Sequence, residues 1–334
     1  MEIRLATADE VRNARELGKI PAPVRLALCM TSCITSQEMH SNFHATLERG
    51  FTPINDHLGA YSGTCSIVGS GPTIKETHKE LVGDVIAINS AISYLLDVGI
   101  VPKFGVLWDG TEIIEKFARP HPDITYLVAS RCHPKVFERL NGCKVIVWHA
   151  GGDHDIIDVM TDPAVAEKMG ILQPLICGGS AGVTRTIYVA SVLGYTDVHL
   201  YGADSCYSAA GETHIRGSVV PEKDIMGSLG DDTPGAPAIW FRTTPEWCAQ
   251  VNEYRSIYAL TVSGRLSAIT QGPSHKLPMN LEVHGESLFK TMHDRLVAKR
   301  TALGDEKFLE DIQQQSEQQN KLDDISSKAD EAKS

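Results

Sequence analysis

Three side chains that can carry acid–base or metal chemistry follow segments predicted to be buried strands. Asp109 follows the apolar run 104–108, Asp204 follows the run 198–201 and the turn after it, and His214 lies in the next loop. An imidazole titrates near neutral pH and accepts a proton from a hydroxyl group, whereas a carboxylate binds Mg²⁺ or orients a hydroxyl. These residue types make His214, Asp109 and Asp204 candidate catalytic residues, and Asp109 and Asp204 candidate metal ligands.

Each of these side chains also has a purely structural interpretation. Asp109 stands two residues before a predicted helix that begins at Thr111, and a carboxylate in that position commonly caps a helix N-terminus. His214 lies in a polar loop and could be an ordinary loop residue. The residue types alone leave both alternatives open.

A glycine turn joins a predicted strand to a predicted helix early in the chain. The turn and the first helical position are Gly69, Ser70, Gly71, Pro72 and Thr73. Such a turn places unpaired N–H groups at the positive end of a helix, where glycine lets a phosphate approach the backbone. Glu76 gives Thr73 the spacing of a capping box, but Ile74 stands where the full GxGxxG fingerprint requires its third glycine. The alternative is a tight turn without a ligand.

A second small-residue turn precedes a predicted helix over residues 181–193. Its residues are Gly178, Gly179, Ser180 and Ala181, and its helix carries Arg185, a candidate phosphate partner, in the second turn. Asn89 ends the strand that follows the first glycine turn, and its amide can both donate to and accept from a ribose or a base. The two turns and Asn89 together predict a nucleotide site.

These residues require a parallel sheet to bring them together. Apolar runs at 66–68, 85–88, 104–108, 124–129, 144–148 and 198–201 alternate with segments of helical pattern. Continuously apolar strands that alternate with helices are typical of a parallel sheet covered on both faces, in which ligands bind beyond the carboxyl ends of the strands. We predict an α/β, Rossmann-like fold.

Two blocks of sequence resemble a known family. SIVGSGPTIKET at 66–77, followed by VIAINSAI, is similar to the MptE-like family, named for an archaeal 6-hydroxymethylpterin diphosphokinase. Bacterial sialyltransferase-like enzymes share this opening and also carry an Asn at the end of the next strand. GGSAGVTRTIYVASVLGYTDVHLYGAD at 178–204 resembles the second nucleotide-facing segment of the same families. The resemblance spans roughly residues 64–217.

The resemblance implies a transferase with a nucleotide donor. In a 6-hydroxymethyl-7,8-dihydropterin diphosphokinase-like reaction, ATP gives diphosphate to a hydroxyl acceptor and Mg²⁺ is held by Asp109 or Asp204. In a glycosyltransferase reaction with a CMP-activated nonulosonic sugar, His214 deprotonates the acceptor, and Ser180 and Ala181 meet the nucleotide. Asp109 stands where the sialyltransferases usually have Asn, which favours the first reaction. A third alternative is a nucleotide-binding or scaffold protein without catalysis.

The charge and the hydrophobic pattern of the chain argue against a general nucleic-acid binder and against a membrane-spanning or secreted protein. The formal charge of −11 argues against a general nucleic-acid binder, which needs a basic surface. No apolar run is long enough to span a bilayer, the N-terminal residues do not resemble a signal peptide, and the eight cysteines are scattered, as in a reducing compartment. We expect a cytoplasmic protein whose partners are a nucleotide donor and a small-molecule or glycan acceptor; a homo-oligomer is compatible with the sequence.

Three regions are expected along the chain. Residues 1–60 are predicted to form a helical N-terminal extension, with a capping box at Thr35 and Glu38. Residues 61–275 form the nucleotide-binding catalytic domain, and residues 276–334 a helical, partly disordered tail that is charged and poor in apolar residues.

Overall fold

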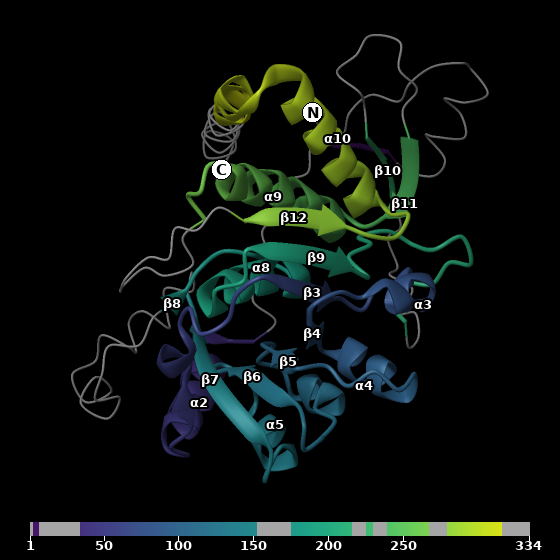
Figure 1. The fold of residues 1–334 in the computed structure, drawn as a ribbon. Helices are drawn as coiled ribbons and strands as arrows, with labels where there is room; N and C mark the ends of the chain where they lie inside the picture. The colour runs from purple at the N-terminus through teal and green to yellow at the C-terminus, as the bar shows by residue number, and fades with distance from the viewer. Residues whose placement is uncertain are drawn as a thin grey trace, which may run out of the picture.

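A parallel sheet forms the centre of the computed structural model, which describes residues 3–6, 34–151, 175–215, 225–229, 239–266 and 279–315. Within these residues the sheet has nine strands, and all of its neighbours pair in parallel (Figure 1). The strands are β2 (Thr52–Pro53), β3 (Thr64–Val68), β4 (Asp84–Ile88), β5 (Phe104–Leu107), β6 (Thr125–Ala129), β7 (Lys144–Ala150), β8 (Leu175–Ile176), β9 (Asp197–Tyr201) and β12 (Asn280–Val283). The predicted α/β, Rossmann-like fold is confirmed.

The strand order creates a switch point beside β3. The order is β12-β9-β3-β4-β5-β6-β7-β2, with β8 paired to β7. The chain runs outward from β3 to β7 and then returns to β9 on the other side of β3. Connections in the two directions place their helices on opposite faces, and a crevice opens where the direction reverses, at the carboxyl ends of β3 and β9.

The helices belong mostly to the connections between strands. They are α2 (Ser36–Leu47), α3 (Ile74–Thr77), α4 (Ser90–Asp97), α5 (Pro134–Arg139), α8 (Gly182–Leu193), α9 (Pro245–Val262) and α10 (Leu288–Leu303), with 3₁₀ helices η1 (Ile54–His57), η2 (His78–Glu80) and η3 (Glu112–Phe117). In α8 the ten residues after Val183 are all buried, since the helix packs against β3, β9 and α9. The helix predicted after the first glycine turn is α3, which continues as η2 and ends before Leu81, where the backbone becomes extended.

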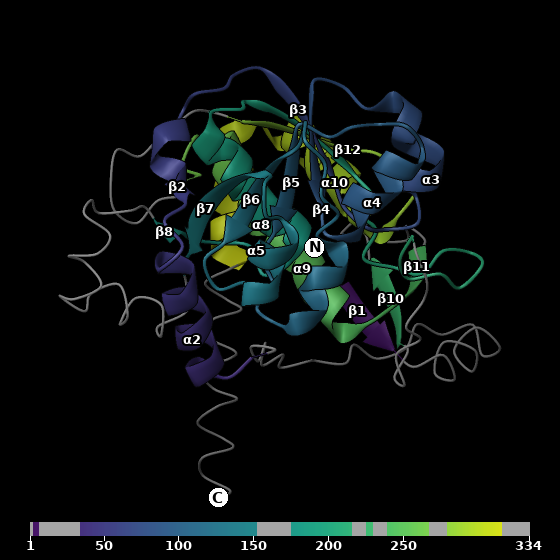
Figure 2. The ribbon, with the colours of Figure 1, turned by 90° about the horizontal axis from the view of Figure 1, so that it is seen from below.

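A small antiparallel sheet stands apart from the main one. It consists of β1 (Ile3–Ala6), β10 (Ile225–Leu229) and β11 (Ile239–Thr243), which lie side by side in Figure 2. β1 contacts α9, and β10 contacts α10. The first strand of the chain therefore joins segments more than two hundred positions later in the sequence.

Both flanks of the expected catalytic domain contribute strands to the main sheet. β2 lies within residues 1–60 and pairs with β7, and β12 lies within residues 276–334 and pairs with β9. In β12 the side chains of Asn280 and Glu282 are exposed and those of Leu281 and Val283 buried, the alternation typical of an edge strand. The expected domain boundaries stay predictions, and residues 7–33 and 316–334 of the two flanks lie outside the described residues.

Three further features of the sequence can be compared with the structure. The capping box of α2 is confirmed: the Thr35 side chain accepts from the Glu38 N–H, and the Glu38 carboxylate accepts from the Thr35 N–H at 2.8 Å. The six described cysteines are free thiols, of which Cys65, Cys132, Cys206 and Cys248 are buried. Among the helices described, none combines the length and the apolar character that crossing a bilayer requires.

Candidate active site

A pocket of about 190 Å³ opens at the switch point of the sheet. The ends of β3, β4 and β9, the N-terminus of α8 and residues of α9 and α10 form its walls. Its lining residues are Gly69, Ser70, Gly71, Ile88, Asn89, Ala181, Gly182, Val183, Thr184, Gly202, Ala203, Asp204, Ser205, Thr213, His214, Trp247, Gln250 and Phe289. The fold therefore brings together residues from both predicted nucleotide segments and the loop that carries His214.

The first glycine turn is fixed to the loop after β9. The N–H of Gly69 donates to Tyr201 O at 2.8 Å, and that of Gly71 donates to Gly202 O at 2.9 Å. A Cβ atom at Gly69 or Gly71 would lie within 2.6 Å of Gly202 O, so only glycine permits this approach. Glycine is therefore required at both positions by the contact with the loop after β9, which the sequence did not indicate. The expectation of unpaired N–H groups at both glycines is corrected, although both residues line the pocket.

Asp204 binds the residue that begins α3. Its carboxylate accepts from the Thr73 N–H at 2.9 Å and from the Thr73 hydroxyl. The Thr73 side chain therefore does not close the expected capping box with Glu76, although Thr73 is the N-cap residue of α3. Asp204 is only 5% exposed, and this burial raises its pKa to about 6 against the lowering effect of the two hydrogen bonds.

The second turn leads to a helix N-terminus that lacks a side-chain cap. The N-cap residue of α8 is Ala181, which has no side-chain acceptor, and Gly182, Val183 and Thr184 line the pocket. The first N–H groups of a helix have no partner within the helix and carry its partial positive charge. The Thr184 hydroxyl accepts from the Ala181 N–H at 3.0 Å. This end of α8 therefore directs its partial positive charge toward the pocket.

Glu253 of α9 occupies the other side of this turn. Its Oε2 atom accepts from the Ser180 N–H at 2.9 Å, from the Ser180 hydroxyl at 2.7 Å and from the Thr184 hydroxyl at 3.1 Å. Ser180, Gly178 and Gly179 lie outside the pocket lining. Gly178 and Gly179 adopt positive φ values, 95° and 78°, which allow the turn to pass tightly against Tyr188 and Arg185.

Asn89 lines the pocket in an unusual backbone conformation. Its φ of 48° is one of two positive values among the described non-glycine residues. Its Oδ1 atom is buried and has no hydrogen-bond partner within the described part of the chain. Buried polar atoms are nearly always paired, and strained backbone concentrates at functional sites. The amide oxygen is therefore placed to accept a hydrogen bond from a ligand.

His214 lies at the mouth of the pocket. Its side chain is open to solvent, its Nδ1 lies 3.1 Å from the Thr213 hydroxyl, and its ring lies 6.3 Å from that of Trp247. Partial desolvation by the surrounding protein lowers the pKa of His214 below its usual value. A neutral imidazole near pH 7 has the protonation state of a general base.

Asp109 and Arg185 do not line the pocket. Asp109 Oδ1 accepts from the Thr111 N–H at 2.9 Å, which is the local contact expected of a structural residue. Arg185 is 9% exposed, donates to Gly151 O and Ile176 O, and lies over the Trp108 ring. The expected orientation of Arg185 toward a phosphate is therefore corrected.

A helix of the N-terminal region covers the strand ends near Asp109. The Asn42 side chain in α2 donates to Gly110 O at 3.1 Å and to Arg131 O at 3.0 Å, and the Thr46 hydroxyl donates to Ser130 O at 3.0 Å. These carbonyls follow β5 and β6. The carboxyl edge of the sheet is thus divided: β3, β4 and β9 open into the pocket, and α2 docks on the loops after β5 and β6.

The sequence did not indicate the wall that α9 and α10 provide. Trp247 and Gln250 of α9 and Phe289 of α10 line the pocket. The N–H of Phe289 donates to Asp204 O at 3.3 Å, which ties α10 to the site. Neither segment carries a glycine turn or a residue at the end of a preceding strand, so no local signal marks them.

Comparisons with known proteins identify the family. The model of the 6-hydroxymethylpterin diphosphokinase MptE-like family matches residues 37–210, which is more than half of the chain. The chain belongs to the MptE-like family. The match begins inside α2, so the family's segment includes the helix that covers β5 and β6. No curated protein matches the chain.

Comparison with solved structures matches part of the MAf glycosyltransferase from Magnetospirillum magneticum AMB-1. The sequence identity is 15% and the TM-score is 0.47. The similarity covers 91% of this chain and 46% of that protein, so this chain spans less than half of its length.

Proposed function

We propose that this protein is a transferase with a nucleotide donor, and that it moves diphosphate from ATP to a hydroxyl acceptor as a 6-hydroxymethyl-7,8-dihydropterin diphosphokinase-like enzyme. The observation that carries the proposal is the uncapped N-terminus of α8, which faces a pocket at the switch point of a parallel sheet. Backbone donors at a positive helix end bind phosphate without a specialised side chain. Membership of the MptE-like family supports this assignment.

The pocket residues have distinct roles in this proposal. Phosphates bind at the N–H groups of Gly182, Val183 and Thr184, and the buried Oδ1 of Asn89 accepts from the ribose or the base. His214, at the mouth, takes the proton from the acceptor hydroxyl as that oxygen attacks the β-phosphorus of ATP, and the bond from the β-phosphorus to the α-phosphate breaks to release AMP. The N–H groups at the N-terminus of α8, which bind the donor phosphates, also stabilise the negative charge that develops on the phosphate oxygens during transfer.

Asp204 alone, rather than a pair of carboxylates, would be the protein ligand of Mg²⁺ in this pocket. Mg²⁺ is usually held by one or two carboxylates together with substrate phosphates, and Asp204 is the carboxylate that lines this pocket. Bound there, the ion would neutralise phosphate charge. Asp109 remains a proposed ligand only if the loop after β5 moves toward the pocket, since it now caps the turn at Thr111.

One observation favours a second reaction, glycosyl transfer from a CMP-activated nonulosonic sugar. His214 lines the pocket with a lowered pKa, whereas Asp109, expected to hold a metal, does not line it. Glycosyl transfer requires a base for the acceptor hydroxyl, and because the attacked atom is a sugar carbon and the donor carries a single phosphate, it does not need a pair of metal-binding carboxylates to neutralise a polyphosphate. The pocket would otherwise be used in the same way, with the phosphate at α8.

Binding calorimetry separates these functions before the acceptor is known. ATP and CMP are titrated into the full chain, with and without Mg²⁺. We expect ATP binding that requires Mg²⁺; binding of CMP without metal would support glycosyl transfer instead. Absence of binding for both nucleotides would contradict the nucleotide-donor proposal.

Two variants show whether binding occurs in this pocket. Asn89→Gly removes the amide and relieves the positive φ, so it should weaken nucleotide binding by about tenfold without loss of stability. His121→Ala, in the loop before β6, is the matched control and should bind as the parent does. Equal affinity of the Asn89 variant would place the ligand elsewhere.

A further inference from the structure

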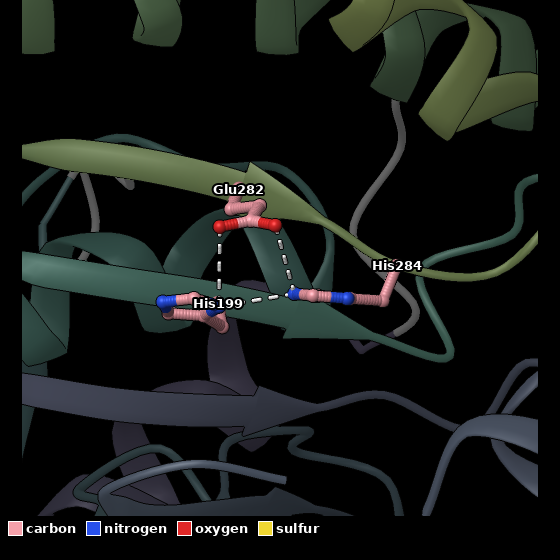
Figure 3. A group of neighbouring side chains, drawn as sticks. All are labelled: His199, Glu282 and His284. Atoms are coloured by element: carbon pink, nitrogen blue, oxygen red, sulfur yellow. Dashed lines mark hydrogen bonds and ion pairs between the residues drawn. The ribbon is translucent and has the colours of Figure 1, made fainter. Parts of the chain in front are cut away.

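Two histidines and a glutamate converge at the edge of the main sheet, outside the pocket. His199 lies in β9, Glu282 lies in β12, and His284 follows β12 directly (Figure 3). His199 and Glu282 are register partners in the parallel pair, and Glu282 and His284 are two positions apart, so all three point to one face. None of them lines the pocket.

The nitrogen and oxygen atoms of this cluster have the separations of metal ligands. His199 Nδ1 lies 3.0 Å from His284 Nε2 and 3.5 Å from Glu282 Oε2, and His284 Nε2 lies 3.7 Å from Glu282 Oε1. Around a tetrahedral ion with bonds of about 2.0–2.1 Å, ligand atoms lie about 3.3 Å apart. Among the described residues, His199, Glu282 and His284 are the group of at least three His, Cys, Asp or Glu side chains whose ligand atoms lie close enough to share one metal ion.

A carboxylate behind His199 orients its ring. His199 Nε2 lies 3.3 Å from Asp197 Oδ2, and Asp197 is itself held by Thr64 and Asn280, both at 2.9 Å. A proton on Nε2 leaves the lone pair of Nδ1 directed at the centre of the cluster. Metal-binding histidines commonly donate their second N–H to a carboxylate in this way.

Packing fixes the second histidine as well. The His284 ring stacks on that of Tyr201, with centroids 4.2 Å apart and an interplanar angle of 5°. Tyr201 is fully buried, and its hydroxyl donates to Glu80 O at 2.8 Å. The histidine side chains are 15% and 19% exposed, whereas Glu282 is 53% exposed. The cluster is therefore rigid on the histidine side and open to solvent on the glutamate side.

We propose that His199, Glu282 and His284 bind a divalent transition-metal ion of the zinc type. Two imidazoles and one carboxylate suit Zn²⁺, whereas Mg²⁺ and Ca²⁺ prefer sets of oxygen ligands. Three protein ligands leave a fourth position toward solvent. The ion joins β12 to β9, and β12 leads into α10, whose Phe289 lines the pocket. The metal thus fastens the last strand and one wall of the pocket to the sheet.

Metal titration of the chelator-treated full chain tests the site. Zn²⁺ is followed by calorimetry and Co²⁺ by its visible absorption. We expect one ion per chain, a Co²⁺ spectrum of nitrogen and oxygen ligation without thiolate charge transfer, and a rise in melting temperature with Zn²⁺. Absence of binding would mean that the two histidines only hydrogen-bond to each other, and a thiolate band would assign the metal to cysteine; either result overturns the proposal.

Variants attribute the binding to the named residues. Glu282→Gln keeps the shape of an exposed side chain and should weaken Zn²⁺ binding, and His284→Gln should abolish it. Asp197→Asn, behind His199, should weaken it by about 10–100-fold. His121→Gln is the control and should leave it unchanged. If folded Glu282→Gln and His284→Gln proteins bind Zn²⁺ as the parent does, the site is elsewhere.

Discussion

At the scale of single residues, His214 is the proposed base. It lines the pocket, its side chain reaches solvent, and desolvation lowers its pKa. These properties suit a group that must be neutral before it accepts a proton and must then release that proton to water.

His214→Gln should lower the turnover number by about 10²–10⁴-fold while nucleotide affinity stays the same. In the parent, activity should fall as pH drops through the lowered pKa of His214, and this acidic limb should vanish in the variant. Turnover in the presence of an acceptor, measured against pH, checks both expectations. Full activity of the variant would remove His214 from the mechanism.

Asp204 makes a residue-scale prediction about stability. Its pKa is about 6 in the folded protein and near 3.8 when exposed, so the folded state binds more protons between these values. Its contribution is therefore present below about pH 4 and lost as pH rises to about 6, by up to about 3 kcal/mol. Asp204→Asn keeps an acceptor for the Thr73 N–H and should remove this loss.

Urea unfolding of parent and Asp204→Asn between pH 4 and 6 measures the difference. The free energy of unfolding of the variant is subtracted from that of the parent at each pH, because other carboxylates change stability with pH in the opposite direction. Desolvation raises the pKa values of Asp84 and Asp197, but their hydrogen bonds outweigh it and the net pKa values are lowered. If the stability of both proteins changes with pH in the same way, burial does not raise the pKa of Asp204.

At the scale of elements, α8 combines a buried body with an uncapped N-terminus. Ala181 has the extended backbone of an N-cap residue, with φ −119° and ψ 163°, but no capping side chain. Ser, Asp and Asn at this position typically stabilise a helix by about 0.5–2 kcal/mol relative to Ala. The missing cap is therefore a cost in stability that leaves donors for a ligand.

Ala181→Ser should raise the free energy of unfolding by about 1 kcal/mol and weaken nucleotide binding, because its hydroxyl competes for the same N–H groups. Ala181→Asp should weaken binding further, since its carboxylate repels phosphate. Chemical unfolding and calorimetry measure the two effects. Unchanged nucleotide affinity in both variants would show that the phosphates do not bind at α8.

At the scale of the whole molecule, segments from both flanks complete the central domain. α2 docks on the loops after β5 and β6, β2 and β12 extend the sheet, and α10 joins α9 of the central domain in one wall of the pocket. The pocket is consequently confined to the ends of β3, β4 and β9.

Asn42→Ala tests the docking of α2. Asn42 is 5% exposed and donates to two backbone carbonyls, so its loss should destabilise the protein by about 1–3 kcal/mol. Nucleotide affinity should not change, because α2 contributes nothing to the pocket lining. Gln37→Ala, exposed on the same helix, is the control and should stay within about 0.5 kcal/mol of the parent. Equal stability of the two variants would contradict the docking.

The sequence by itself determined the family and the six strands β3, β4, β5, β6, β7 and β9 of the parallel sheet, because continuous apolar runs and glycine turns are local patterns. It also determined that Gly69, Asn89, Ala181, Asp204 and His214 share one site, since carboxyl ends of parallel strands meet at one edge. The tertiary structure alone decided which strand ends stay open. The docking of α2 near Asp109, the bonding of the glycine N–H groups to the loop after β9, and the meeting of His199 with Glu282 and His284 depend on contacts between residues far apart in sequence, which no local pattern encodes.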